Sequence, residues 1–418
     1  MKEKLNILIV GNSGAASALC KKLYNSPNIG KLYTAPGFCV PSDNVIPADI
    51  REDDLTGLLK FTVENNIDLT IPTSAKALKS DIVSFFLTNG QNIFGPTLNA
   101  CQIALNKNFG KKFLYKIHAQ TSKFGIFDKL QQAEEYLRTA NFPVTIKSSE
   151  HNNTEDMLVC PTTALAREFL DNLFSKNETG ILIEEYTCGH TFTIYYITDG
   201  YSAIPISTIA NYKFMEDGDG GIYTNGMGCF APDYKVSEII SSRVQNIVRN
   251  TLKALDKKGS PYIGIIGVEC TITGEDKFYV NEFKPFLQDY DASVVLNSID
   301  DNLIKIFMAC IDGLFADEYE EIQQNNLNSI SAVVYSRHNN KIIQGFDNIE
   351  DIENIDFINL KHTTDDKYLT IKGNVFTLTR NASTLTRAKK YLYEDLEQIH
   401  FDGIKYRKDL GGSKCYSQ

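Results

Sequence analysis

The chain has no excess of basic residues. Its 418 residues include 42 lysines and arginines against 52 aspartates and glutamates, which gives a formal net charge of −10 at pH 7. A nucleic-acid binder needs a stripe of Lys and Arg that displaces counterions from the phosphate backbone. The composition therefore argues against a nucleic-acid partner, and it leaves room for small anionic substrates in local basic pockets.

Two further absences indicate a cytoplasmic protein. The nine cysteines are scattered and form no C-x-x-C pair, so the sequence predicts neither a disulfide framework nor a zinc site. No apolar run is long enough to span a membrane, and no apolar signal core follows Met1. We therefore expect reduced thiols, a cytoplasmic location and no membrane partner.

The first 100 residues alternate between short apolar runs and helical patterns. The first run, 5–10, ends in a turn from Gly11 through Asn12 to Gly14, and a helical pattern follows it. This alternation predicts a doubly wound parallel α/β sheet. The turn is compatible with a phosphate site at a helix N-terminus. The alternative is the tight first turn that many parallel sheets need whatever they bind. The turn is not a G-x-G-x-x-G, so a dinucleotide-dependent oxidoreductase is the least favoured interpretation.

The middle of the chain has shorter elements. A single helix is expected over 98–117, and the pattern that follows predicts a small α+β unit with antiparallel strands. A hairpin is expected over 192–209. The polar, glycine-rich stretch 211–228 is expected to be a loop that is either functional or disordered, and the acidic stretch 317–328 a linker.

Two glutamates give the strongest chemical signal. Glu269 and Glu282 lie near the ends of two strand-like runs joined by a short polar turn, so residues 265–283 predict a β-hairpin. Paired carboxylates suit Mg²⁺, which commonly accompanies nucleotide phosphates. The alternative from these residues alone is two solvated acids on one face of a hairpin.

Several segments together resemble the phosphoribosylamine-glycine ligase family of the ATP-grasp superfamily, which makes glycinamide ribonucleotide in purine synthesis. The resemblance covers nearly the whole chain in order. Its motifs are Ile-Leu-Ile-Val-Gly-Asn (7–12), Ala-Pro-Gly (35–37), Ile-Asp-Leu-Thr-Ile (67–71), Ile-Phe-Gly-Pro-Thr (93–97), Asn-Lys-x-Phe-x-Lys-x-Phe-Leu (106–114), Val-Thr-Ile-Lys (144–147), Ile-Leu-Ile-Glu-Glu-Tyr (181–186), Gly-Met-Gly (226–228), Asn-Glu-Phe (281–283) and Tyr-Arg-Lys-Asp-Leu-Gly (406–411).

This resemblance implies three domains. They are an N-terminal α/β domain over 1–100, an ATP-grasp domain of two α+β subdomains over 101–325, and a small C-terminal α+β domain over 326–418. The ATP-grasp domain includes a lid subdomain at about 122–186. The implied cofactors are ATP and Mg²⁺ (or Mn²⁺), and the implied partners are small-molecule amine and carboxylate substrates, with the protein a monomer or homodimer.

The resemblance also implies roles for individual residues. The ATP-binding residues would be Lys107, Lys147, Glu184, Glu185 and Tyr186. The metal ligands would be Glu269 and Glu282, and the catalytic residues Lys213 and Lys284. The substrate-binding residues would be Gly11, Asn12, Gly14, Asp219, Gly226, Gly228, Asp289 and Arg407.

The chain departs from the family pattern at several of these places. An Arg-Glu-His is replaced by Ala15-Ala16-Ser17, and a Gly-Pro-Glu turn by Pro72-Thr73-Ser74. Glu155 stands where the lid would carry a lysine, and an acid there repels a triphosphate. His190 and Thr191 replace an expected acid, Lys284 replaces a metal-binding Asn, and Phe286 an Arg expected to hold the glycine carboxylate.

Three hypotheses follow. The leading one is an ATP-dependent carboxylate-amine ligase that works through an acyl phosphate, with phosphoribosylamine and glycine as the default substrates. A ligase for a different amine and carboxylate in a specialised pathway is an alternative, because the substrate pocket is altered. The other alternative is a nucleotide-binding relative without turnover.

Overall fold

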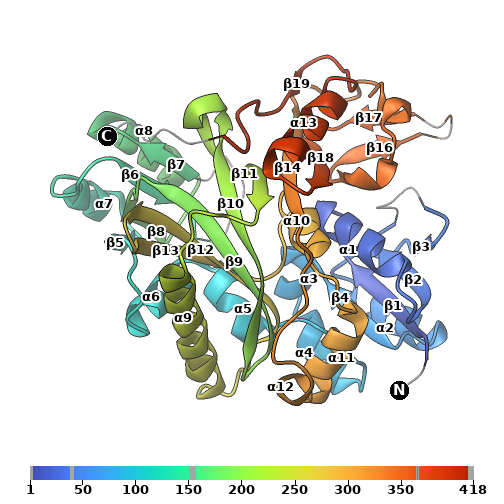
Figure 1. Cartoon of the computed structure of the whole chain (residues 1–418). Coiled ribbons are helices and arrows are strands. Elements are labelled where there is room, and N and C mark those ends of the chain that lie inside the picture. Colours follow the sequence, from blue (N-terminus) through green and yellow to red (C-terminus); the bar gives the residue numbers. More distant parts are fainter. Residues whose placement is uncertain (1–2, 38–41, 150–156, 364, 366, 413–418) are drawn as a thin grey trace.

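The computed structural model of the chain describes residues 3–37, 42–149, 157–363, 365 and 367–412. Figure 1 shows a long central sheet with three groups of elements around it. The N-terminal elements lie on one side, a small sheet with two helices lies on the other, and the C-terminal elements lie above the N-terminal ones. Glu155, which the sequence places in the lid, lies outside the described residues.

The N-terminal region folds as the predicted parallel sheet. Its strand order is β3-β2-β1-β4, and every pair in it is parallel. The strands are β1 (Leu5–Val10), β2 (Ile29–Ala35), β3 (Val45–Pro47) and β4 (Leu69–Pro72). Residues of β1 on both faces are buried against helices, which is why its sequence is continuously apolar rather than alternating.

Helices cover both faces of this sheet (Figure 1). They include α1 (Gly14–Tyr24), α2 (Leu55–Glu64), α3 (Ala75–Lys79), α4 (Ile82–Thr88) and α5 (Leu98–Leu105). The single helix expected over 98–117 is wrong, because it breaks between α5 and α6 (Lys107–Lys116). Asn106 has extended backbone there, and its side chain accepts from the N–H of Phe109 as the N-cap of α6.

The central sheet has nine strands, all paired antiparallel. Its main path runs β13-β12-β9-β10-β11-β14-β18-β15, and β19 pairs with β14. Its first five strands are β9 (His190–Asp199), β10 (Ala203–Glu216), β11 (Gly220–Ala231), β12 (Ile263–Gly274) and β13 (Lys277–Lys284). The predicted hairpins 192–209 and 265–283 are both confirmed by these pairings.

The loop expected over 211–228 is wrong. These residues form most of β10 and β11, which pair with each other around a tight turn at Asp217–Asp219. Gly218 lies in this turn, whereas Gly226 and Gly228 are packing positions in β11. Gly226 has φ +155 and faces the ring of Tyr290, while Gly228 has φ +154 and faces Ser331 and Leu410. A side chain at either position would collide with these neighbours.

A small antiparallel sheet stands opposite the β12–β13 end of the central sheet (Figure 1). Its order is β5-β8-β6-β7, and two helices pack on it to form a separate apolar cluster. Its elements are β5 (Phe124–Phe127), α7 (Leu130–Leu137), β6 (Val144–Lys147), β7 (Met157–Cys160), α8 (Thr163–Ser175) and β8 (Ile181–Glu185). This is the α+β unit that the sequence predicts.

The remaining elements complete the central sheet and its covering layers. The helices are α9 (Glu238–Asp256), α10 (Ala292–Asn297), α11 (Leu303–Asp312), α12 (Phe315–Glu318) and α13 (Leu385–Leu396). The strands β14 (Asn328–Ser336), β15 (Ile355–Phe357), β18 (Gly373–Ala382) and β19 (Ile404–Lys405) belong to the central sheet. The strands β16 (Leu360–His362) and β17 (Tyr368–Thr370) pair with each other in a separate two-stranded sheet. Strands on both sides of residue 326 therefore share one sheet.

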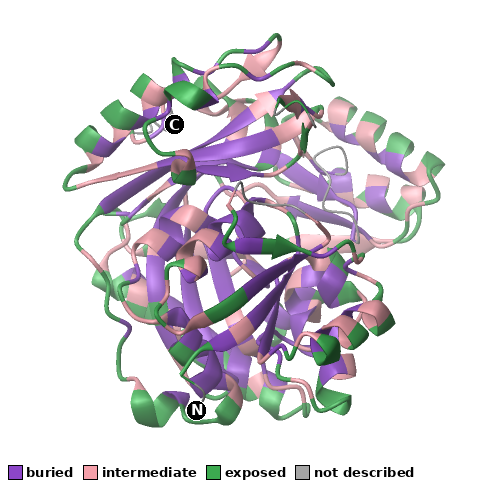
Figure 2. Ribbon diagram, turned by 90° about the vertical axis from the view of Figure 1, so that its right-hand side faces the viewer, coloured by how far each residue is buried: buried purple, intermediate pink, exposed green. Residues whose placement is uncertain are grey.

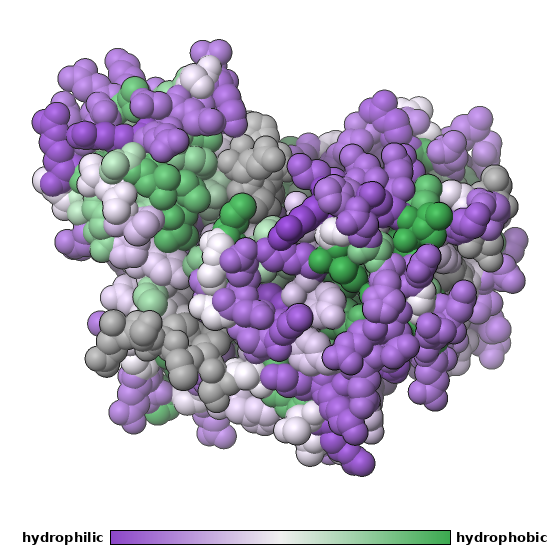
Figure 3. Space-filling view, turned by 90° about the horizontal axis from the view of Figure 1, so that it is seen from above, coloured by the Kyte–Doolittle hydropathy of each residue, from purple (hydrophilic) through white to green (hydrophobic). Residues whose placement is uncertain are grey.

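The strands form the buried centre of the molecule, and exposed residues gather on the outer helix faces (Figure 2). Seen from above, the surface is largely hydrophilic, with hydrophobic side chains in small groups (Figure 3). Among the described residues, none of the helices combines the length and apolarity needed to cross a bilayer.

Candidate active site

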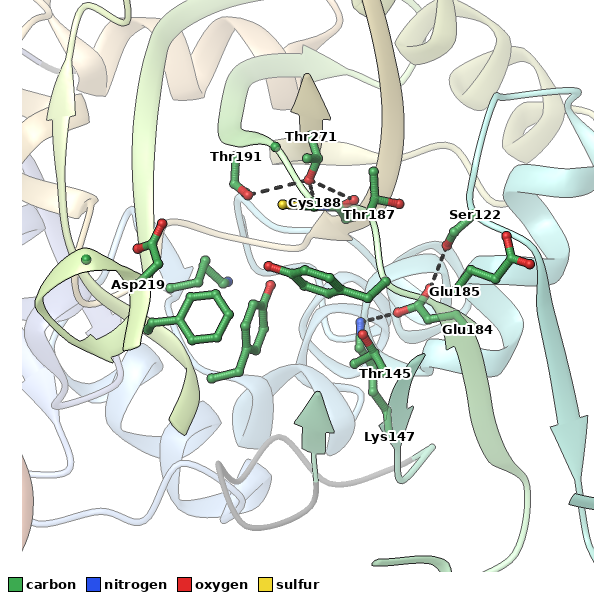
Figure 4. Close-up of a pocket in the computed structure, with 17 residues that line it drawn as sticks. Ser122, Thr145, Lys147, Glu184, Glu185, Thr187, Cys188, Thr191, Asp219 and Thr271 are labelled. Carbon is green, nitrogen blue, oxygen red and sulfur yellow. Dashed lines mark hydrogen bonds and ion pairs between the residues drawn. The ribbon is translucent and has the colours of Figure 1, made fainter. Parts of the chain in front are cut away.

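A polar cavity of about 280 Å³ lies between the small sheet and the central sheet (Figure 4). Its walls come from β6, β8, β9, β10, β11, β12 and β13, and from the segment that follows β8. The predicted residues Lys147, Glu184, Glu185, Tyr186 and Lys213 all line it, as does Asp219. The structure therefore brings most of the predicted nucleotide-binding residues to one place.

Glu184 is held in this cavity by two lysines. Its carboxylate oxygens lie 2.6 Å from Nζ of Lys147 and 2.6 Å from Nζ of Lys111, and Figure 4 shows Lys147 and Glu184 pointing toward one another. The Ser122 hydroxyl also donates to Glu184 at 3.1 Å. Burial alone would raise the pKa of Glu184, but the two ammonium groups lower it to about 2. Glu184 is therefore an anion that fixes both lysines.

Lys111 was not among the predicted site residues. It is buried on α6, and it also donates to the Thr121 hydroxyl at 2.8 Å. A signal existed, because Lys111 is the second lysine of the Asn-Lys-x-Phe-x-Lys motif. Because α6 carries Lys107 one turn earlier, the motif places two lysines on one side of a helix.

The carboxylate hairpin places Glu269 directly opposite Glu282 in the β12–β13 register. Two lysines contact these acids. Oε2 of Glu269 lies 3.0 Å from Nζ of Lys213 and 3.1 Å from Nζ of Lys284, and Oε1 of Glu282 lies 2.5 Å from Nζ of Lys284. The other oxygen of Glu269 accepts from the Asn281 side chain at 3.3 Å.

A second cavity, of about 70 Å³, adjoins this cluster. It shares Lys147, Lys213 and Tyr223 with the first cavity, and it is also lined by Lys107, Lys284, Glu269 and Glu282. Four lysines and two glutamates leave a formal surplus of two positive charges. Such a surplus in a buried space suits a polyphosphate. Burial lowers the pKa of Lys107 to about 8, so an anion placed beside it would favour its charged form.

The turn at the start of α1 is closed by an internal carboxylate. Asp289 accepts from the backbone N–H of Ala15 at 3.0 Å, and it also interacts with Ser13 and with the backbone of Gly14. Ser13 itself makes no capping hydrogen bond, so Asp289 takes that place. Burial raises the pKa of Asp289, and its carboxyl group occupies the helix N-terminus that predicts a phosphate site.

The other predicted substrate residues lie in two places. Gly11 has φ +150 and lies against the Thr73 side chain, at the same end of the N-terminal sheet as Asn12 and Gly14. Arg407 is 1% exposed, and its guanidinium contacts Asp219 at 2.7 Å and Asp409. In this arrangement Arg407 fastens the turn between β10 and β11 to the C-terminal segment.

The residues that depart from the family pattern lie in several environments. Thr191 lines the polar cavity and Lys284 the lysine-rich cavity, whereas His190 is buried and contacts Asp233 at 2.5 Å. Ala15, Thr73 and Phe286 instead line an apolar cavity of about 30 Å³ beside the carboxylate hairpin. Pro285 and Phe286 line both this space and the lysine-rich cavity. Among the described residues that line the apolar cavity, none is charged.

Solved structures share this arrangement of sheets. The crystal structure of phosphoribosylamine-glycine ligase from Thermotoga maritima matches with a TM-score of 0.79 at 18% identity, and covers 97% of this chain and 100% of its own. The biotin carboxylase domain of 2-oxoglutarate carboxylase from Hydrogenobacter thermophilus, solved with MgADP, matches with a TM-score of 0.70 at 13% identity and covers 96% and 92%. The fold is therefore that of the ATP-grasp proteins, a class of ATP-dependent ligases.

Sequence comparisons narrow this class. Phosphoribosylglycinamide synthetase, N domain, matches residues 5–104, and its ATP-grasp (A) domain matches residues 105–292. The phosphoribosylamine-glycine ligase of Clostridium acetobutylicum is 29% identical over 420 residues, covering 98% of this chain and all of its own; that of Neisseria meningitidis serogroup B is 27% identical over 419. The chain belongs to the phosphoribosylglycinamide synthetase family, whose members are carbon–nitrogen ligases that use ATP with Mg²⁺.

Mg²⁺ has a poor fit to the carboxylate pair as it stands. Three of the four oxygens of Glu269 and Glu282 have a lysine or amide donor on them. Mg²⁺ requires near-octahedral oxygen ligands at about 2.0–2.1 Å. Among the described residues, there is also no group of three or more His, Cys, Asp or Glu side chains that could hold a metal ion.

Proposed function

We propose that this chain joins a carboxylate to an amine at the cavity pair described above, with ATP bound across both cavities. The observation that carries the proposal is the sharing of Lys147, Lys213 and Tyr223 between the two spaces. The larger cavity has room for a nucleoside beside the end of β8, and the smaller one has the surplus positive charge that phosphates need. The predicted roles of Lys107, Lys147, Glu184, Glu185 and Tyr186 rest on this placement.

The chemistry follows from these positions. A carboxylate oxygen attacks the γ-phosphorus of ATP and ADP leaves; the amine nitrogen then attacks the acyl carbon, phosphate leaves, and the nitrogen loses a proton. Lys107 and Lys147 position the phosphates as compact cations. Lys213 and Lys284 face the same cavity and stabilise the charge on the departing phosphate. Mg²⁺ bound to the nucleotide supplies further charge neutralisation at the phosphates.

Phosphoribosylamine and glycine are the first substrates to test, because the relatives of highest similarity reported above are named for them. The helix end occupied by Asp289 and the apolar cavity beside Phe286 support a second candidate pair within the same reaction class. That pair would be a different carboxylate and amine, without a phosphate that depends on α1. Among the described residues, none of the seven cysteines is in a disulfide, which agrees with a cytoplasmic site of action.

The test is a turnover assay on the purified protein with ATP and Mg²⁺. ADP release is measured with phosphoribosylamine plus glycine and then with a panel of other amines and carboxylates, and each amide product is identified by mass. We expect ADP and amide in equal amounts that require both substrates. The Lys147→Met variant should lose activity by about 10²–10³-fold, as expected for removal of one stabilising donor.

The matched control is Lys123→Met, because Lys123 is exposed and lies 3.8 Å from Glu185 at the edge of the same site. It should keep its activity. Nucleotide binding with no ADP release from any substrate pair would contradict the ligase proposal.

A further inference from the structure

Lys284 occupies an unusual position for a lysine. It lies two residues after Glu282 on β13, so both side chains point to the same face of the hairpin. Glu269 is directly opposite Glu282 on β12 and points to that face too. Three side chains of the hairpin therefore meet, and the one ammonium group among them lies 2.5 Å from Glu282 and 3.1 Å from Glu269.

Lys284 and Lys213 together offset the charges of the two carboxylates. Lys284 is 7% exposed and Glu269 1% exposed, so neither is free to exchange its partner for bulk water. At 2.5 Å and 3.1 Å, the Lys284 ammonium forms an ion pair with each of the two carboxylates.

We infer that the ammonium of Lys284 is a built-in cation for the carboxylate pair, and that it keeps a free divalent ion out of the space between Glu269 and Glu282. A divalent ion there would meet an ammonium within hydrogen-bond distance of both of its carboxylate ligands, and like charges at that range repel strongly. It would also have to displace contacts already made to three of the four oxygens.

The role of Lys284 in ATP binding rests on the proposed ligase function. If ATP binds across the two cavities, its Mg²⁺ arrives on the phosphates, and Lys284 faces those phosphates from the protein side. Lys284 then has two roles: with Lys213 it offsets the charge of the glutamates before ATP arrives, and it contributes positive charge once the nucleotide is bound. The cavity therefore keeps its positive surplus in the absence of metal.

The experiment measures metal binding without any nucleotide. Mn²⁺ is titrated into the purified full-length protein, and the free ion is followed by electron paramagnetic resonance. We expect wild type to show no site at the hairpin. Lys284→Met and Lys284→Asn should each gain one Mn²⁺ site that binds at least tenfold more tightly than any wild-type site. Adding Glu269→Gln to either variant should remove the gained site.

Lys213→Met is the matched control. It removes the other ammonium from Glu269 but leaves Lys284 between the two acids, so it should gain no Mn²⁺ site. A stoichiometric wild-type site that Glu269→Gln abolishes would overturn the inference. So would two folded Lys284 variants that gain no site. Because neither ATP nor substrate is present, these outcomes are independent of the turnover assay.

Discussion

The carboxylate hairpin and the N-terminus of α1 are two regions in which a side chain of the chain itself stands where a ligand ion was expected. At the hairpin, the Lys284 ammonium lies between two acids that predict a metal. At α1, the Asp289 carboxylate lies on backbone N–H groups that predict a phosphate. The first region uses an internal ammonium group and the second an internal carboxyl group.

The difference between them lies in what remains for a ligand. Around the hairpin, four lysines exceed the two glutamates and a cavity adjoins them. At α1, the N–H groups are already bound, and the adjoining cavity is apolar. The two internal groups therefore have opposite effects on phosphate binding. Lys284 leaves positive charge at the hairpin for phosphates, whereas Asp289 blocks the N–H groups at the start of α1.

The largest expected effect comes from removing a buried carboxylate from the polar cavity that adjoins the hairpin. Glu184→Gln leaves Lys111 and Lys147 buried without their shared carboxylate. Removing one partner of a buried ion pair costs about 3–5 kcal/mol of unfolding free energy. Urea denaturation monitored by circular dichroism measures it. An unchanged midpoint would show that the two lysines do not depend on Glu184.

A pH dependence is expected from a group between the two regions. Asp291 is buried, and burial raises its pKa to about 7, although the Tyr195 hydroxyl donates to it at 2.7 Å and lowers it. The unfolded carboxyl titrates near ~3.9, so the folded state holds the extra proton between these values. Stability therefore falls as pH rises toward 7, by about 2 kcal/mol between about pH 5.5 and 7.

Thermal unfolding of wild type and Asp291→Asn across this pH range measures the effect. The variant should lack that part of the slope, because its amide does not titrate. Parallel slopes in the two proteins would mean that Asp291 is ionised in the folded protein throughout the range.

The role of Asp289 is tested by removing its carboxylate from the N-terminus of α1. Asp289→Ala removes the carboxylate from the N–H of Ala15, which should cost about 1–2 kcal/mol, as for the loss of a helix cap. The exposed N–H groups should then bind an anion. We expect inorganic phosphate to raise the melting temperature of Asp289→Ala more than that of wild type. Equal shifts would show that Asp289 does not block an anion site.

The smallest effect on the unfolding free energy is expected at Glu185, which serves as a control at the rim of the cavity. Glu185 is next to Glu184 but is partly exposed, and it lies 3.8 Å from an exposed Lys123. Glu185→Gln should change the unfolding free energy by less than about 1 kcal/mol, the usual range for a surface ion pair. The same urea titration compares it with Glu184→Gln, and similar losses would contradict the assignment of the effect to burial.

Sequence patterns predicted those structures that depend on residues close together in the chain. The parallel sheet follows from apolar runs separated by helical patterns, and the hairpin from two strand-like runs around a polar turn. The position of Lys284 also has a local signal, because residues two apart on a strand share a face. The expected loop over 211–228 is wrong, because its glycines serve close packing against Tyr290 and Leu410.

No local sequence pattern predicted that Asp289 caps α1. Asp289 and Ala15 are 274 residues apart, and their contact depends on how the hairpin's end approaches the N-terminal sheet. The Arg407–Asp219 pair, 188 residues apart, is another such case. Sequence patterns identify the residue types at these places, while their partners are set by tertiary packing.

The most direct test of the central claim is isothermal titration of a non-hydrolysable ATP analogue, with Mg²⁺, into wild type, Lys147→Met and Lys123→Met. Lys147 lies in both cavities, whereas Lys123 lies outside them. We predict binding to wild type and Lys123→Met with the same affinity, and at least tenfold weaker binding to Lys147→Met. A folded wild type that does not bind the analogue, or equal affinity in all three proteins, would contradict a nucleotide site across these cavities.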